Sequence, residues 1–193
     1  MSLRPSSPGW PARDDDAYSG VRVSMDAQLA TARPRFHVDV NVGDPIRPAP
    51  RPVHIPGLLG GEVVMLGYPL AMVHAEKVVT AISRGSFNTR WRDFADICLL
   101  SRHHGVDGTE LVESIRHVAG HRRIELLALA GRLDGYGDIG QERWVAWRRK
   151  QRVEDRLPER FTEVVSAVVA FADPAIAGTV EARAWDPNAG AWS

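Results

Sequence analysis

Long apolar runs are missing from this chain of 193 residues. No stretch reaches the roughly 18 apolar residues that a membrane-spanning helix needs, so we expect no contact with a membrane. The first residues, MSLRPSSPGW, lack the apolar segment of a secretory signal. Cysteine is scarce as well. Cys98 is the single cysteine, so it cannot form an internal disulfide. These absences predict a protein of the reducing cytoplasm.

A surplus of charge of either sign is also missing. The chain has 24 basic and 24 acidic residues, so its formal net charge is zero and bulk charge does not indicate a nucleic-acid partner. Lysine is rare, because only Lys77 and Lys150 are lysines and the other basic residues are arginines. Lys77 therefore stands out against an arginine-rich background.

The first quarter of the chain reads as strands and connections. Residues 1–19 carry Pro, Ser and Asp with little to bury, which predicts a flexible N-terminal arm. Strands are expected at 21–25 and 36–42, where apolar residues alternate with polar ones. Residues 44–57 hold five prolines and predict an extended connection without a helix. Residues 63–66 are a candidate returning strand.

The rest of the chain has helical periodicity. We expect a helix at 69–84, with Pro69 in its first turn and Gly85 at its end, and a second at 90–103, capped by Asn88 or Thr89. Further helices are expected at 109–118, 122–131, 143–152 and 159–172. The fold class is therefore α+β, a small mixed β-sheet followed by a helical half. We divide the chain into the arm 1–19, an α+β core 20–105, a C-terminal helical region 106–178 and a weakly specified tail 179–193.

Candidate site residues gather around the turn between the two strongest helices. Lys77 lies on the first helix, and Asp93 and Asp96 lie one turn apart on the second. Three arginines, Arg84, Arg90 and Arg92, surround the turn. A cation that reaches phosphates, with carboxylates nearby, is typical of a nucleotide–metal site. An ion-pair network that only holds the two helices in register is the competing interpretation.

Asp39 is a candidate metal ligand on the sheet. It lies between valines on the polar face of the segment FHVDVNV at 36–42. In metal-dependent nucleotidyl transfer, carboxylates on rigid strands hold divalent ions that neutralise the phosphates. Without further support, a solvent-facing aspartate is the more common explanation for such a residue.

A tryptophan-bearing basic segment offers a weaker signal. Trp144, Trp147 and the residues 148–152 could stack on RNA bases and neutralise phosphates. An amphipathic surface helix with partly buried tryptophans is the interpretation that we prefer. The histidines have no recognisable metal-ligand spacing.

The stretch 67–102 resembles a known family. Its residues contain the pattern Y-P-x-x-x-x-x-A-E-K at 68–77 and R-G-x-x-N-[ST]-R-x-[RK]-D-x-x-D at 84–96. Both are similar to the core of the AbiEii/AbiGii nucleotidyltransferase toxin family, which has the polymerase-β-like fold. The resemblance covers roughly residues 19–172, and Asp39 corresponds to a carboxylate on the family's sheet.

This resemblance implies a function. It implies the toxin component of a bacterial toxin–antitoxin or abortive-infection system, with a cognate antitoxin as partner. The implied chemistry is transfer of a nucleotide from an NTP to an RNA acceptor with Mg²⁺ or Mn²⁺, and some members extend tRNA acceptor ends. The implied catalytic residues are Asp39, Lys77, Asp93 and Asp96, with Asp39 as metal ligand. The residues expected to bind the nucleotide are Lys77, Arg84, Arg90 and Arg92.

The sequence departs from the family pattern at its start. No Gly-Gly-Thr-Ala-Leu segment and no R-x-S-x-D-L-D-F strand is present, and that strand supplies the principal metal carboxylates of the family. Arg22 to Asp26 mimics its first half, but Gln28 occupies the second carboxylate position. We therefore expect an N-terminally truncated member. It either transfers nucleotides with Asp39 and one of Asp26 or Asp44 as ligands, or binds nucleotide, RNA or antitoxin without catalysis.

Overall fold

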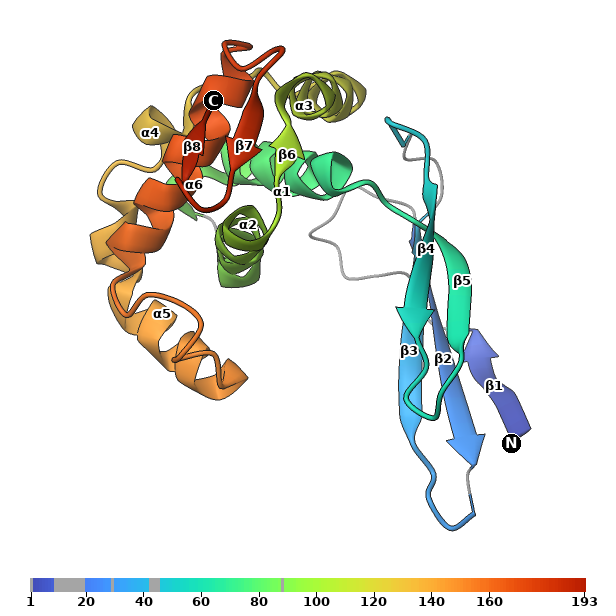
Figure 1. Ribbon diagram of the computed structural model, residues 1–193. Coiled ribbons are helices and arrows are strands. Elements are labelled where there is room, and N and C mark those ends of the chain that lie inside the picture. The colour runs from blue at the N-terminus through green and yellow to red at the C-terminus, as the bar shows by residue number, and fades with distance from the viewer. Residues whose placement is uncertain (1, 9–19, 29, 42–45, 88) are drawn as a thin grey trace. The chain divides into compact units, whose positions relative to one another are not determined.

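The chain folds into two compact units, residues 1–45 and 46–193 (Figure 1). The computed structural model describes residues 2–8, 20–28, 30–41, 46–87 and 89–193. The α+β class is confirmed, but the strands form three small antiparallel sheets instead of one mixed sheet. The predicted boundary near residue 105 lies inside the second unit, and the domain assignment stays a prediction. Most of the predicted arm lies outside the described residues, as do Val42, Asp44 and Asn88.

The first unit is a three-stranded antiparallel sheet. Its strands are β1 (Ser2–Pro8), β2 (Gly20–Gln28) and β3 (Arg35–Asn41), in that order across the sheet. The alternation of apolar and polar residues in the sequence predicted β2 and β3 correctly. Val23 lies opposite Val38, and the apolar residues of both strands share one face. Within this unit that face remains substantially exposed.

A β-hairpin begins the second unit. Strand β4 (Arg51–Pro56) pairs with β5 (Glu62–Gly67). The candidate strand at 63–66 is confirmed, whereas the strand β4 inside the extended, proline-rich connection was not predicted. Almost every residue of both strands is exposed, and Leu58 and Leu59 at the tip are fully exposed. The hairpin leads directly into the first helix.

The remaining elements form a helical body. In chain order they are α1 (Leu70–Arg84), the 3₁₀ turn η1 (Gly85–Phe87), α2 (Trp91–His103), β6 (Val106–Asp107), α3 (Gly108–Arg122), α4 (Leu129–Arg132), α5 (Tyr136–Gln151), α6 (Phe161–Ile176), β7 (Ala184–Asp186) and β8 (Ala191–Trp192). Helix α6 contacts α2, α3, α4 and α5, so its apolar face is central to the core (Figure 1). No described helix has the length and apolar composition to cross a membrane.

Several helix boundaries differ from the prediction. Helix α3 continues to Arg122 and ends where Arg123 adopts a left-handed φ of 55°, so the predicted helix at 122–131 is wrong except for the short α4. Helix α5 begins at Tyr136, well before residue 143. Its first turns contain Gly137 and Gly140, and close packing requires glycine at both positions because a Cβ would lie within 3 Å of Thr162 or Phe161.

Residues 179–193, expected as a weakly specified tail, contain two strands. Strands β7 and β8 pair with each other, and β7 also pairs with β6. Trp185 is buried, and its indole N–H donates a hydrogen bond of 2.7 Å to the Ser101 carbonyl at the end of α2. A buried tryptophan therefore anchors this segment to the helical body.

One histidine lies unpaired in the core. His74 on α1 is fully buried against Phe171, and neither of its ring nitrogens has a hydrogen-bond partner in the part of the chain that the structure describes. Burial, with smaller contributions from the charges of Lys77 and His104, lowers the pKa of His74 from 6.5 to about 4. The folded protein therefore keeps His74 neutral at pH values where the unfolded chain protonates it.

This histidine predicts a loss of stability in weak acid. Between pH 6.5 and about 4 the unfolded chain binds the additional proton, so the free energy of unfolding falls as pH falls, by up to roughly 3 kcal/mol. Urea unfolding of His74→Leu at several pH values should show a shallower acid decline than the wild type, while exposed His103→Gln should follow the wild type. Parallel curves for wild type and His74→Leu would contradict the assignment.

Candidate functional site

The turn between α1 and α2 positions the candidate site. Gly85 ends α1 with a φ of 54°, a conformation that glycine adopts without steric cost, and its N–H bonds to the Ala81 carbonyl. The Arg132 guanidinium donates two hydrogen bonds, of 3.2 and 3.0 Å, to the Ile82 carbonyl in the last turn. Helix α2 then begins after Arg90, which has no side-chain cap, so the predicted Thr89 cap is wrong. The chain reverses within a few residues.

Lys77 bridges the two aspartates across this turn. Its Nζ lies 3.0 Å from Asp93 Oδ1 and 2.8 Å from Asp96 Oδ2. The three side chains are partly buried, with exposed fractions of 19% for Lys77, 15% for Asp93 and 31% for Asp96. The sequence predicted these residues as a cluster, and the structure brings them together.

The electrostatics of the cluster favour a charged lysine. Burial acts to lower the pKa of Lys77, but hydrogen bonds and charges from Asp96 and Asp93 outweigh it, so the pKa lies above its usual value of 10.5. Two of the three ammonium donors serve the aspartates, which leaves a third for a ligand. Each aspartate also uses only one oxygen for Lys77. Among the described residues, the third ammonium donor and the second oxygen of each aspartate therefore have no partner, and they lie beside one another.

The three candidate arginines differ in their surroundings. Arg92 lies 3.7 Å from Asp96 at the (i, i+4) spacing and is 83% exposed, so this pair contributes little to stability. Arg84 and Arg90 are half-buried at the end of α1 and the start of α2. Their roles in nucleotide binding stay predictions.

A second ion pair fixes the opposite flank of α1. Glu76 binds the guanidinium of Arg122 on α3, and Arg122 also donates a hydrogen bond of 3.0 Å to Thr80 Oγ1. Consecutive residues of the A-E-K pattern thus contact different helices, Glu76 facing α3 and Lys77 facing α2. Sequence reasoning missed Arg122, because nothing local marks a partner 46 residues away.

An aromatic cluster supports α2 from behind the site. Trp91 stacks on Tyr136 with ring centroids 5.7 Å apart and meets Phe161 edge-on at 5.2 Å. Phe94 contacts the same two rings. These contacts join the first turn of α2, which carries Asp93, to α5 and α6. We therefore expect the aromatic cluster to position the carboxylates.

Asp39 has a partner of its own on the sheet. The guanidinium of Arg22, directly opposite on β2, donates two hydrogen bonds of 2.6 and 2.8 Å to its two carboxylate oxygens. The bonds from Arg22 hold the pKa of Asp39 below its usual value. Asp26 pairs with Arg35 in the same way. Among described residues, no three His, Cys, Asp or Glu side chains gather as metal ligands, so Asp39 as a metal ligand stays a prediction.

The tryptophan-bearing helix has the architecture that we preferred. Trp144 is fully buried, and its indole N–H donates to the Pro158 carbonyl at 3.0 Å. Arg148 is buried as well and donates to the Glu154 carbonyl at 3.0 Å. Neither side chain can stack on a nucleic-acid base, whereas Trp147 is half-buried.

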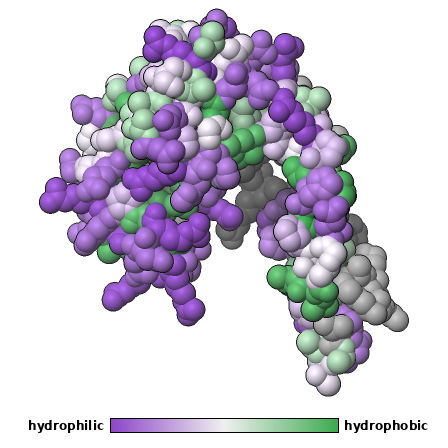
Figure 2. All heavy atoms as spheres, viewed as in Figure 1, coloured by the Kyte–Doolittle hydropathy of each residue, from purple (hydrophilic) through white to green (hydrophobic). Residues whose placement is uncertain are grey.

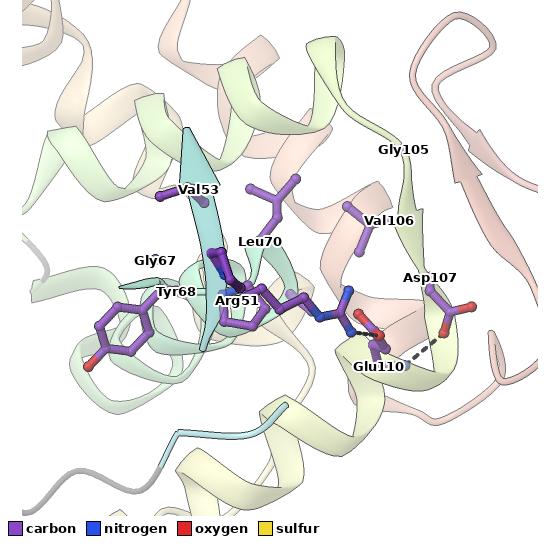
Figure 3. Close-up of a pocket in the computed structure, with 12 residues that line it drawn as sticks. Arg51, Val53, Gly67, Tyr68, Leu70, Gly105, Val106, Asp107 and Glu110 are labelled. Carbon is purple, nitrogen blue, oxygen red and sulfur yellow. Dashed lines mark hydrogen bonds and ion pairs between the residues drawn. The ribbon is translucent and has the colours of Figure 1, made fainter. Parts of the chain in front are cut away.

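A pocket of about 410 Å³ lies at the start of α1 (Figure 3). Tyr68 and Pro69 of the family pattern line it. Arg51 reaches from β4 to Glu110 on α3, with a distance of 2.6 Å between the charged atoms. Lys77 does not line this pocket, so the two halves of the Y-P…A-E-K pattern serve different places on the molecule.

Comparison with known proteins identifies the family. The family model for the nucleotidyl transferase AbiEii toxin of type IV toxin–antitoxin systems matches residues 4–167. Searches of curated proteins and of solved structures found no match. The match covers most of the chain, including every residue of the Lys77 cluster and Asp39. The chain therefore belongs to the AbiEii nucleotidyl transferase toxin family.

Proposed function

We propose that this protein transfers a nucleotide from an NTP to an RNA acceptor, with Lys77 holding the triphosphate. The supporting observation is the partly exposed Lys77 ammonium. Two aspartates keep it charged, and one of its three donors has no partner among the described residues. A fixed positive charge of this kind suits a triphosphate, since negative charge builds up on the departing pyrophosphate during transfer. Membership of a nucleotidyl transferase family makes this reaction the natural one.

The proposed reaction is a displacement at the α-phosphorus. A hydroxyl of the RNA attacks, a new oxygen–phosphorus bond forms, and the bond to the β-phosphate breaks to release pyrophosphate. The second carboxylate oxygen of Asp93 or Asp96 accepts the hydroxyl proton, since each aspartate uses only one oxygen for Lys77. A divalent ion, Mg²⁺ or Mn²⁺, would enter with the NTP and would supply neutralisation of the phosphate charge. The described carboxylates do not form a metal site by themselves.

The direct test is a transfer assay. The full chain is incubated with each of four labelled NTPs, Mg²⁺ and total tRNA, and the RNA is resolved on a denaturing gel. We expect label in the RNA and release of pyrophosphate, both dependent on protein. Neither signal with any of the four nucleotides, with Mg²⁺ or with Mn²⁺, would contradict transfer to this class of RNA.

A member that binds without transferring is the second candidate. The observation that favours it is the two-point pairing of Asp39 with Arg22, which occupies the only sheet carboxylate that the resemblance assigned to metal. Calorimetry with NTPs, with tRNA and with the product of the neighbouring antitoxin gene distinguishes the two functions. Binding with no transfer would establish this second function.

A further inference from the structure

Unpaired cations collect at one end of α5. Residues 143–160 contain seven basic and three acidic side chains, in a chain whose formal net charge is zero. Six of the basic residues, all except Arg148, are exposed and make no side-chain hydrogen bond or ion pair with the described part of the chain. Five of these six, leaving out Arg160 at the start of α6, form what we call the α5 cationic surface: Arg143, Arg149, Lys150, Arg152 and Arg156. Figure 2 shows hydrophilic residues over this end of the helical body.

Buried residues hold this surface in one shape. Trp144 and Arg148 point inward and bond to the carbonyls of Pro158 and Glu154 in the following loop. Gln141 adds two hydrogen bonds. Its side-chain amide donates one of 3.0 Å to the Glu159 carbonyl and accepts one of 2.8 Å from the Phe161 N–H. The loop at 152–160 is thereby fastened along α5. Cations of the helix and of the loop are therefore presented together without further ordering.

Helix stability explains only part of this arrangement. Cations in the last turn of a helix are favoured by the helix dipole, which accounts for Arg149 and Lys150. The effect falls off within one turn, so it does not account for Arg143, two turns earlier, or for Arg156 in the loop. Unpaired, like-charged side chains repel one another, which indicates a polyanionic partner.

The helix that carries this surface packs, in its first turns, against the helix that carries the candidate site. Gly140 on α5 faces Trp91 at such close range that an added Cβ would lie 2.9 Å from the indole ring. Trp91 opens α2, and Asp93 follows two residues later. Helix α5 has 16 residues and is about 24 Å long. A polyanion bound along it would run toward the α1–α2 turn.

We infer that the α5 cationic surface binds the phosphate backbone of the RNA acceptor and directs its end to the Lys77 cluster. This inference rests on the proposed function for the identity of the polyanion. RNA fits better than an acidic protein, because protein interfaces centre on apolar and aromatic anchors. The large apolar side chains exposed on α5 are only Ile139 and Val145. Contacts that use cations alone are typical of phosphate recognition.

The test compares two triple variants of the full chain. Arg149→Gln, Lys150→Gln and Arg152→Gln together remove three cations of the surface. The control, Arg33→Gln, Arg102→Gln and Arg183→Gln, removes three exposed cations that have no ion pair with the described residues. Fluorescence anisotropy with labelled total tRNA, without NTP, measures Kd at several salt concentrations. Thermal melting confirms that both variants fold.

We expect the α5 variant to bind tRNA about tenfold or more weakly and to lose roughly two to three units of slope in log K against log salt. The control should bind as the wild type does, and because the assay contains no NTP, this result is independent of whether transfer occurs. Equal weakening by both triple variants, or none by the α5 variant, would overturn the inference. Affinity for poly-L-glutamate is measured in parallel. If the α5 variant lost affinity for poly-L-glutamate but not for tRNA, the surface would be assigned to an acidic protein instead.

Discussion

Replacing Lys77 with methionine is expected to reduce nucleotide transfer by about a hundredfold or more. The variant keeps much of the side-chain length but removes the ammonium that we assign to the triphosphate. Loss of a single preorganised charge or donor at a reacting group typically costs that much in rate. The measurement is initial transfer of labelled nucleotide to tRNA, at NTP concentrations high enough to separate kcat from KM. Arg102→Met, an equal change of charge at the far end of α2, should transfer as the wild type does.

The loss must be separated from a loss of folding. Without Lys77, Asp93 and Asp96 remain as neighbouring carboxylates, and Asp93 is only 15% exposed. Repulsion and poor solvation would destabilise the turn between α1 and α2. A triple variant, Lys77→Met with Asp93→Asn and Asp96→Asn, removes all three charges and should regain much of the lost melting temperature. Because it still lacks the ammonium, its transfer should stay low.

An ion-pair lattice with no chemical role makes the opposite prediction. In that case transfer would follow stability in every variant, and the triple variant would recover both. Wild-type transfer by a folded Lys77→Met would likewise remove Lys77 from the mechanism. The two interpretations that the sequence left open are thus separated by measuring both quantities on the same proteins.

The Lys77 cluster was accessible from sequence because its geometry is local. Helical spacing placed Asp93 and Asp96 on one flank, and the short turn at Gly85 brought that flank back to Lys77. The resemblance then supplied a reason to look there. The pairing of Glu76 with Arg122 was not accessible, since it depends on how α3 packs against α1.

Asp39 shows a different limit. Its position on an exposed strand was predicted, and Arg22 was visible in the same sequence. That the two lie directly opposite depends on the β2–β3 register, which alternation alone does not determine, because a shift of two residues preserves the same faces. The bidentate pair with Arg22 is therefore a feature that only the structure reveals.

The helices were predicted where one signal dominated and missed where signals conflicted. Regular apolar spacing with a glycine stop determined α1. The predicted helix began only at residue 143, whereas α5 begins at Tyr136 and includes two glycines that pack closely against α6. After α3, helical spacing continued past Arg123, while its left-handed backbone ended the helix. Tertiary contacts decided each of these boundaries.

Phe161→Ala is expected to be the most destabilising single truncation in the aromatic cluster, by about 3–5 kcal/mol. The ring is fully buried, and its centroid lies 5.0–5.7 Å from those of Trp91, Phe94, Tyr136 and Trp144. Removing it leaves a cavity where α2, α5 and α6 meet, and rigid rings on every side limit how far that cavity can collapse. Urea unfolding at pH 7 measures the change, and Ile139→Ala, at a side chain 76% exposed, should change stability by less than about 0.5 kcal/mol.

The same variant tests how the carboxylates are positioned. Since Phe161 supports Trp91, and Trp91 opens the helix that carries Asp93, the cavity should loosen the first turn of α2 before the whole domain unfolds. Hydrogen exchange under native conditions should show faster exchange in the first turns of α2 than at the buried end of α3. Transfer measured well below the melting temperature should then fall more than the folded fraction does. Unchanged exchange in α2, with transfer proportional to the folded fraction, would show that the aromatic cluster stabilises the fold without positioning the site.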